Sequence, residues 1–126
     1  MIDVNRYLGA QYVEGGRVWP QIDCYGLVLL VRRDLGLPDW PEWGGVTKKD
    51  DGLHNVGTEF VRKLERCEPQ PGAVACCYAG GLMIHVAVVV ECDGLLHSLE
   101  INARRGTTCL PLRRFERRFV RVEYYR

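Results

Sequence analysis

The spacing of the apolar residues changes once along this chain, near Pro69, and that change constrains the fold more than any other feature. Before this point apolar residues recur at the three- and four-residue spacing of amphipathic helices. After it they form short runs, many of them rich in valine, separated by turn signals, as strands do. Helices followed by strands predict an α+β fold, with N-terminal helices packed on an antiparallel meander sheet. The 126 residues suit a single domain over 1–126.

The clearest predicted helix begins after Asp23 and ends before Gly36. Aspartate is a favoured N-cap, and glycine fits the left-handed position that follows many helices. The residues between them are apolar on several faces, so we expect this helix to lie in the centre of the molecule. A short helix over about 3–9 and a second main helix at about 52–66 are also predicted. Loops are expected over 12–23 and 37–51.

The second half of the chain contains five candidate strands. Gln70-Pro71-Gly72 marks the turn before the first of them, and Cys92-Asp93-Gly94 is typical of a hairpin turn. The predicted strands are 73–78, 84–90, 95–99, 107–110 and 119–124.

Composition excludes several classes of protein. The chain is 47% hydrophobic and 26% charged, which is enough apolar content to build a core. It has no apolar run of the roughly 18 residues that a membrane helix needs, so no membrane insertion is predicted. The N-terminus does not show the pattern of a secretory signal peptide.

The C-terminal segment is strongly basic, although the net charge of the whole chain is only +1. Residues 104–126 contain eight arginines against Glu116 and Glu123. Apolar residues alternate with these arginines, and the segment has no recognisable nucleic-acid-binding motif. We therefore interpret it as a solvated face around a buried strand, with no nucleic acid as partner.

The six cysteines are expected to be free thiols. No signal peptide and no CxxC pair is apparent, and the chain is long enough to fold without disulfides. Adjacent strand residues face opposite sides of a sheet, so Cys76 and Cys77 are expected to point apart. We predict no metal and no cofactor.

Cys24 differs from the other cysteines because it follows a helix N-cap. The positive end of a helix favours a thiolate, which is the nucleophilic form of cysteine. A nucleophilic cysteine also needs a base, for which His85 and His97 are the candidates. A tight turn at Asp93-Gly94 would set His85 opposite about Asn102. The spacing therefore leaves His97, Glu100 and Asn102 open as the third member of the site, and His54 is expected to be a surface residue.

Three blocks of the sequence, in order, resemble the NlpC/P60 cysteine peptidases: QYVEGGRVWPQIDCYGLVLLVRRDLGL, QPGAVACC and HVAVVVECDGLLHS. The resemblance implies a papain-like fold with Cys24 as nucleophile and His85 as general base. It places His97 at the third polar position, which orients the base. Tyr12 falls on the family tyrosine beside the nucleophile and the oxyanion site, and Asp23 is expected to cap the helix and brace the loop.

Details of these blocks are most similar to the phage-tail branch of the family. Among them are Cys-Tyr-Gly-Leu-Val and the closing Tyr-Tyr-Arg. Ala73 and Ala87 depart from the usual Asp and Gly of the family, and residues 37–51 match no part of it. This resemblance implies an endopeptidase that cleaves peptidoglycan stem peptides, often between D-γ-glutamyl and diaminopimelate. It implies other tail-tip proteins as partners, and a location in the virion tail tip or, before assembly, in the host cytoplasm. The alternative is a structural tail-assembly component with weak or vestigial activity.

Overall fold

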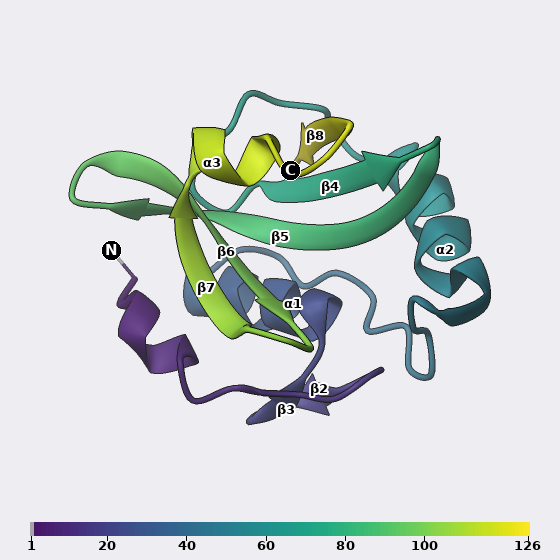
Figure 1. Ribbon diagram of the computed structural model, residues 1–126, viewed down its shortest axis with the longest axis horizontal. Coiled ribbons are helices and arrows are strands. Elements are labelled where there is room, and N and C mark those ends of the chain that lie inside the picture. The colour runs from purple at the N-terminus through teal and green to yellow at the C-terminus, as the bar shows by residue number, and fades with distance from the viewer. Residues whose placement is uncertain (1) are drawn as a thin grey trace.

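A five-stranded antiparallel sheet forms the centre of the computed structural model, which describes residues 2–126 (Figure 1). Met1, the first residue of the predicted domain, lies outside the described residues. The strand order is β7-β6-β5-β4-β8, so four consecutive strands make a meander and the last strand joins beside β4. Mixed helices and antiparallel strands confirm the predicted α+β class. The strands are β4 (Val74–Ala79), β5 (Leu82–Cys92), β6 (Leu95–Asn102), β7 (Gly106–Pro111) and β8 (Arg121–Tyr125).

Helix α1 (Cys24–Asp34) packs on β5 and β6 and fills one side of the sheet. Its apolar residues Leu27, Val28 and Val31 are fully buried, as the sequence predicted for a central helix. They join one core with alternate residues of the strands, such as Val88 and Leu99. This core fixes the position of α1 relative to the sheet.

The other side of the sheet is covered by α3 (Leu112–Glu116), a short helix that the strand pattern did not predict. Phe115 from this helix is fully buried in a second core. The sheet offers small side chains there, including Ala73, Ala75 and Ala87, which leave room for the ring. The two adjacent cysteines of β4 divide between the two cores, Cys76 on the α1 side and Cys77 on the α3 side, so they point apart as predicted.

Helix α2 (Gly52–Val61) is shorter than the predicted helix over 52–66. The chain leaves the helix at Arg62 because the following residues pair with the C-terminal strand. Arg66 forms an isolated bridge with Tyr125, and the Cys67 amide donates to the carbonyl of Tyr124. Residues 62–64 form a turn in place of further helix, and the chain then meets the edge strand β8 at Arg66. A 3-10 turn, η2 (Lys49–Asp51), precedes α2.

The N-terminal part is more regular than the loop predicted over 12–23. After a 3-10 turn, η1 (Val4–Tyr7), capped by Asp3, the chain forms a small sheet in the order β1-β3-β2. Its strands are β1 (Gln11–Tyr12), β2 (Arg17–Val18) and β3 (Gln21–Ile22). A side chain at Gly16, directly before β2, would place its Cβ 2.4 Å from the carbonyl oxygen of Gln21, so the close approach of this residue to β3 requires glycine.

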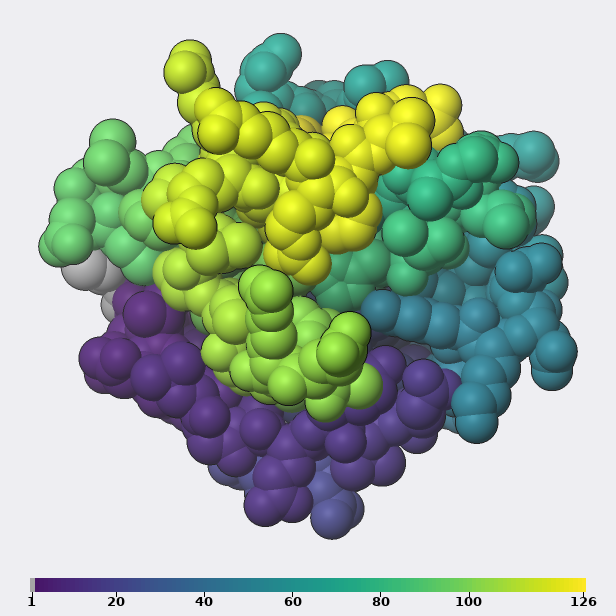
Figure 2. Space-filling view, in the orientation of Figure 1, coloured from purple at the N-terminus to yellow at the C-terminus, as the bar shows by residue number. Residues whose placement is uncertain are grey.

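All eight arginines of residues 104–126 are exposed, while Phe115, Tyr124 and Tyr125 of the same segment are buried. This confirms the interpretation of a solvated face around buried elements. The C-terminal segment, yellow in Figure 2, makes up much of the upper part of the visible face. Across residues 2–126, no helix is both long and apolar enough to cross a membrane.

Candidate active site

Cys24 is the first residue of α1, directly after the N-cap Asp23. The Asp23 Oδ1 atom accepts a hydrogen bond from the Gly26 amide at 2.9 Å, which confirms the predicted cap. Gly26 lets the first turn of the helix approach the preceding loop, because a Cβ at this position would lie 2.4 Å from the carbonyl oxygen of Gly16. The Cys24 side chain is thereby held in a buried position, with the residue 3% exposed.

His85 reaches Cys24 from β5, the long bent strand of the sheet (Figure 1). The register between β4 and β5 pairs Cys77 with His85 but Tyr78 with Met83, so Ile84 is an extra residue. Such a bulge reorients the neighbouring side chains. His85 is 4% exposed and lies close enough to Cys24 that each side chain shifts the pKa of the other. The structure therefore brings together the predicted nucleophile and the predicted base.

Glu100 on β6 holds the other side of the His85 ring. The His85 Nε2 atom lies 3.0 Å from Oε1 of Glu100, whose side chain is fully buried. The second carboxylate oxygen accepts a hydrogen bond from Nη1 of Arg118. The observed register between β5 and β6 pairs Val88 with Leu99, and its continuation sets His85 opposite Asn102 as predicted. Glu100 is two residues from Asn102 on the same strand, so it faces the same side.

The structure corrects the position expected for His97. In the register of β6 this residue lies opposite Val90, five residues along β5 from His85. Its Nδ1 atom is 3.0 Å from the carbonyl oxygen of Leu95. The side-chain oxygen of Asn102 accepts from the Arg105 amide. Of the three residues that the spacing left open, only Glu100 is hydrogen-bonded to the His85 ring.

Lys48, which the sequence analysis did not single out, contacts the remaining ring nitrogen of His85. Its Nζ lies 3.0 Å from Nδ1. A lysine ammonium can only donate, so Nδ1 accepts from Lys48 and the ring proton is on Nε2, where it is donated to Glu100. Since Glu100 occupies Nε2, Nδ1 is the ring nitrogen that remains for an interaction with Cys24.

Burial and charge act in opposite directions on these groups. Burial raises the pKa of the Cys24 thiol, but its hydrogen bond with His85 and the charges of His85 and Lys48 bring that pKa below its ordinary value. Burial lowers the pKa of His85, whereas its hydrogen bonds with Cys24 and Glu100 outweigh burial and raise it. Burial raises the pKa of Glu100, yet its contacts with His85 and Arg118 hold it below the usual range. The interaction between the two side chains therefore favours the thiolate of Cys24 and the protonated form of His85, whereas the Lys48 contact at Nδ1 requires a neutral ring.

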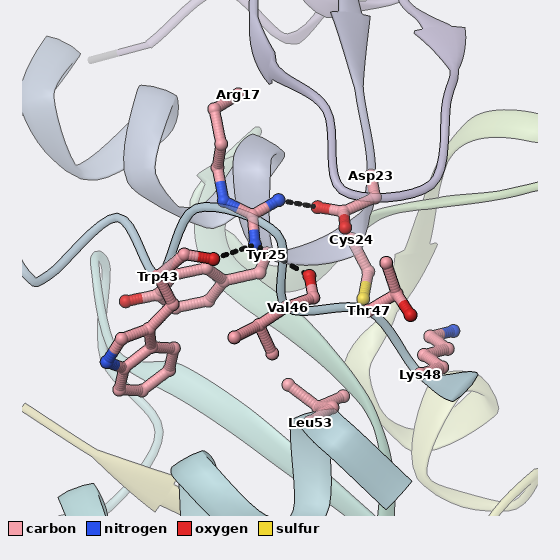
Figure 3. A pocket seen from close by; sticks show the side chains of 9 residues that line it. All are labelled: Arg17, Asp23, Cys24, Tyr25, Trp43, Val46, Thr47, Lys48 and Leu53. Carbon is pink, nitrogen blue, oxygen red and sulfur yellow. Dashed lines mark hydrogen bonds and ion pairs between the residues drawn. The ribbon is translucent and has the colours of Figure 1, made fainter. Parts of the chain in front are cut away.

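Arg17 ties the start of α1 to the segment that covers it, residues 41–48 (Figure 3). Its Nη1 atom donates to Oδ1 of Asp23 at 2.7 Å, in a pair whose side chains are less than a tenth exposed. The same guanidinium donates to the carbonyl oxygens of Glu42, Trp43 and Val46. Trp43 stacks on Tyr25 of α1, with ring centroids 4.7 Å apart.

The covering segment leaves a small hollow beside the nucleophile. Its empty volume is about 230 Å³, and Cys24, Thr47 and Lys48 are among the residues that line it. Figure 3 shows the Cys24 sulfur near Thr47, with Lys48 beyond it. The approach to the sulfur therefore passes between α1 and residues 46–48.

Tyr12 lies at the same end of α1, on the neighbouring strand β1. Its hydroxyl donates to Oε1 of Glu14 at 3.4 Å. Burial raises the pKa of Tyr12, and the negative charge of a Cys24 thiolate raises it further, which places the hydroxyl within electrostatic range of the sulfur. Tyr12 is thus a neutral donor near the nucleophile.

His54, expected to be a surface residue, joins α2 to β5. Its Nδ1 accepts from the Met83 amide at 3.0 Å, beside the bulge that sets His85. Within residues 2–126, no three His, Cys, Asp or Glu side chains are grouped so that they would hold a metal ion. All six cysteines are free, and the sulfurs of Cys92 and Cys109 lie 3.8 Å apart.

Comparisons with known proteins add no family to this description: the chain matches no protein-family model, and a search of curated proteins finds no match.

Proposed function

We propose that this chain is a cysteine peptidase with a papain-like fold of the NlpC/P60 type. The observation that carries the proposal is the chain of contacts from Cys24 to His85 to Glu100. A nucleophile at a helix N-terminus, a base hydrogen-bonded to it and a third group that orients the base are the parts of nucleophilic catalysis. The sequence blocks that resemble the family contain the first two of these residues.

In the proposed mechanism the Cys24 thiolate attacks the scissile carbonyl carbon, and the oxygen becomes an oxyanion. The Cys24 amide is at the first position of α1, where backbone N–H groups lack intrahelical partners, so it is available to stabilise that oxyanion. Tyr12 becomes a second donor when its hydroxyl turns from Glu14 to the oxyanion. As the C–N bond breaks, His85 transfers its proton to the leaving amine, and a thioester remains. Water, deprotonated by His85, hydrolyses the thioester and releases the acid.

Glu100 takes the role that the resemblance assigned to His97. Its carboxylate holds the Nε2–H of His85, which keeps Nδ1 directed at the sulfur, and it stabilises the imidazolium that forms. Arg118 positions the carboxylate through its second oxygen. Asp23 acts through structure alone, as the cap of α1 and the partner of Arg17.

The proposed substrates are peptidoglycan stem peptides, cleaved at the bond between D-γ-glutamyl and diaminopimelate. The proposed setting is the tail tip of a phage or prophage, with other tail-tip proteins as partners and the host cytoplasm as the site before assembly. The proposed substrates and the proposed setting both rest on the similarity of the Cys-Tyr-Gly-Leu-Val block and the closing Tyr-Tyr-Arg to the phage-tail branch.

Incubation of the protein with defined muropeptides, followed by mass spectrometry, tests this proposal. We expect cleavage by the wild type and none by Cys24→Ala or His85→Ala. Cys67→Ala and His97→Ala are the matched controls, since both residues lie away from the Cys24–His85 contact. Cleavage that survives Cys24→Ala would exclude the proposed nucleophile.

A second candidate function is a structural component of the tail, and one observation favours it. Cys24 is almost completely buried, and Lys48 occupies the ring nitrogen that would accept its proton. A thiol-reactive probe separates the two functions. Selective modification of Cys24 at neutral pH supports the enzyme, whereas a rate no higher than that of the partly exposed cysteines Cys67, Cys92 and Cys109 supports the structural role.

A further inference from the structure

Lys48 is the one cation that contacts the catalytic base directly. Among the described residues, no carboxylate lies within ion-pair distance of its Nζ. The two carboxylates nearest the reacting groups have other partners, since Asp23 pairs with Arg17 and Glu100 pairs with Arg118. The only hydrogen-bond partner of the Lys48 ammonium in the described structure is therefore a neutral ring nitrogen.

This contact conflicts with the proposed reaction. When Nδ1 of His85 accepts a hydrogen bond from Lys48, its lone pair is not free to take the proton of the Cys24 thiol. The positive charge of Lys48 also opposes the imidazolium that the reaction needs, although it favours the thiolate. Catalysis therefore requires the ammonium to move away from Nδ1 while staying near the sulfur.

The position of Lys48 permits such a movement. It lies between two fixed points, the part of the covering segment anchored by Arg17 and the start of α2, where the Leu53 amide donates to the Thr47 carbonyl. Its side chain is partly exposed and lines the hollow that contains the sulfur (Figure 3). An anion entering this hollow meets the ammonium and the sulfur together.

We propose that Lys48 binds a carboxylate of the substrate next to the scissile bond, and that this binding releases Nδ1 of His85. The inference rests on the proposed function. In a γ-linked glutamyl peptide the free α-carboxylate is separated from the scissile carbonyl carbon by three carbon atoms, and Lys48 and Cys24 are both on the Nδ1 side of one imidazole. A charge-assisted bond from the ammonium to a carboxylate is stronger than the bond to a neutral nitrogen, so the substrate draws Lys48 away.

Alkylation of Cys24 with iodoacetate and iodoacetamide tests the anion site without any peptidase assay. The two reagents differ in charge and are close in size. Relative to free cysteine, we expect the wild type to favour iodoacetate, and Lys48→Met to reduce the iodoacetate/iodoacetamide rate ratio at Cys24 by about tenfold, the loss of one charge-assisted contact of about 1.4 kcal/mol. Lys49→Met, at the neighbouring exposed lysine, is the control and leaves the ratio unchanged. An equal ratio in wild type and Lys48→Met overturns the inference, as does a Cys24 that reacts with neither reagent.

A pair of γ-D-glutamyl peptides, one with the free α-carboxylate and one with the α-carboxamide, separates this inference from the proposed function. Preference for the carboxylate peptide in the wild type, lost in Lys48→Met, supports both. Equal cleavage of the two peptides by the wild type overturns the role of Lys48 and leaves the peptidase in place. A charge-dependent alkylation ratio without cleavage of either peptide overturns the peptidase and leaves an anion site at Cys24.

Discussion

The Nε2 atom of His85 and the Oε1 atom of Glu100 lie 3.0 Å apart across two neighbouring strands, in a region closed to solvent. In the proposed function this pair assigns to Glu100, and not to His97, the orientation of His85. We predict that Glu100→Gln lowers the rate of peptide cleavage by about 10²–10⁴-fold, because the amide stabilises the imidazolium poorly and permits the wrong tautomer. His97→Gln is the matched control and changes the rate less than about twofold. Steady-state kinetics on one muropeptide measure both, and the reverse ranking would return the role to His97.

The same substitution is expected to change the pH dependence of stability. The folded-state pKa of Glu100 is depressed, because the contacts with His85 and Arg118 outweigh burial. Its contribution to stability is therefore present above the unfolded pKa of about 4.3 and is lost as pH falls through the lower folded value. Glu100→Gln should cost about 1.5–3 kcal/mol of unfolding free energy at pH 7. Urea titrations should show this difference shrinking below about pH 4, and a constant difference would contradict it.

The rate at which iodoacetamide modifies Cys24 should stay high well below neutral pH. Burial raises the pKa of the Cys24 thiol, but His85 and Lys48 bring that pKa below its ordinary value. An ordinary thiol, with a pKa of about 8.5, is mostly protonated at pH 7. In His85→Asn the midpoint of the rate profile should move to alkaline pH. Cys67, whose pKa burial raises, is the internal reference within the same molecule. Coincident profiles for Cys24 and Cys67 would exclude an activated thiol.

Asp23 and Arg17 form a nearly buried pair, so removal of either partner should destabilise the fold. Asp23→Ala leaves the Arg17 guanidinium without its carboxylate and removes the cap of α1, at an expected cost of about 3–5 kcal/mol. Asp23→Asn keeps an oxygen for the Gly26 amide and should cost less. Denaturant unfolding of Asp23→Ala, Arg17→Met and the variant that carries both changes forms a double-mutant cycle with the wild type. The coupling energy between the two residues should exceed about 1 kcal/mol.

Gly26 and Gly44 provide a matched pair of alanine substitutions. At Gly26 the new Cβ would lie 2.4 Å from a backbone oxygen, so Gly26→Ala should cost about 3 kcal/mol or more and should slow the modification of Cys24. At Gly44 no atom lies within 4 Å of the new Cβ, and the change should stay within about 0.5 kcal/mol. Thermal unfolding compares the two directly.

Local signals in the sequence were sufficient for much of the fold. The cap at Asp23, the apolar residues of α1 and the hairpin turn near Asp93 each act over a few residues, and the structure confirms all three. The predicted end of α2 at residue 66 was wrong, because Arg66 pairs with Tyr125, a residue distant in sequence. Helix α3 was missed, because its five residues leave too short a pattern for periodicity to detect.

The residues of the candidate site also divide into those that the sequence predicted and those that it missed. The hairpin register correctly set His85 near Asn102 and left Glu100 as a candidate, but the choice among the three residues depends on side-chain contacts that only the folded chain creates. Arg17 and Lys48 were missed because each acts on a group at least six positions away, through contacts that only the folded chain creates. A basic residue soon after the Gly-Gly pair, facing a buried Asp23, is the one signal that would have pointed to Arg17.

Arg17 binds the covering segment only through main-chain oxygens, those of Glu42, Trp43 and Val46. An anchor of this kind does not depend on which side chains the segment carries. The exposed residues Glu42 and Gly44 can therefore change while the backbone keeps its path over Cys24, whereas Trp43 is also held by its stacking on Tyr25. A protein engineer can use these two positions to vary the surface beside the sulfur without disturbing the Arg17 anchor.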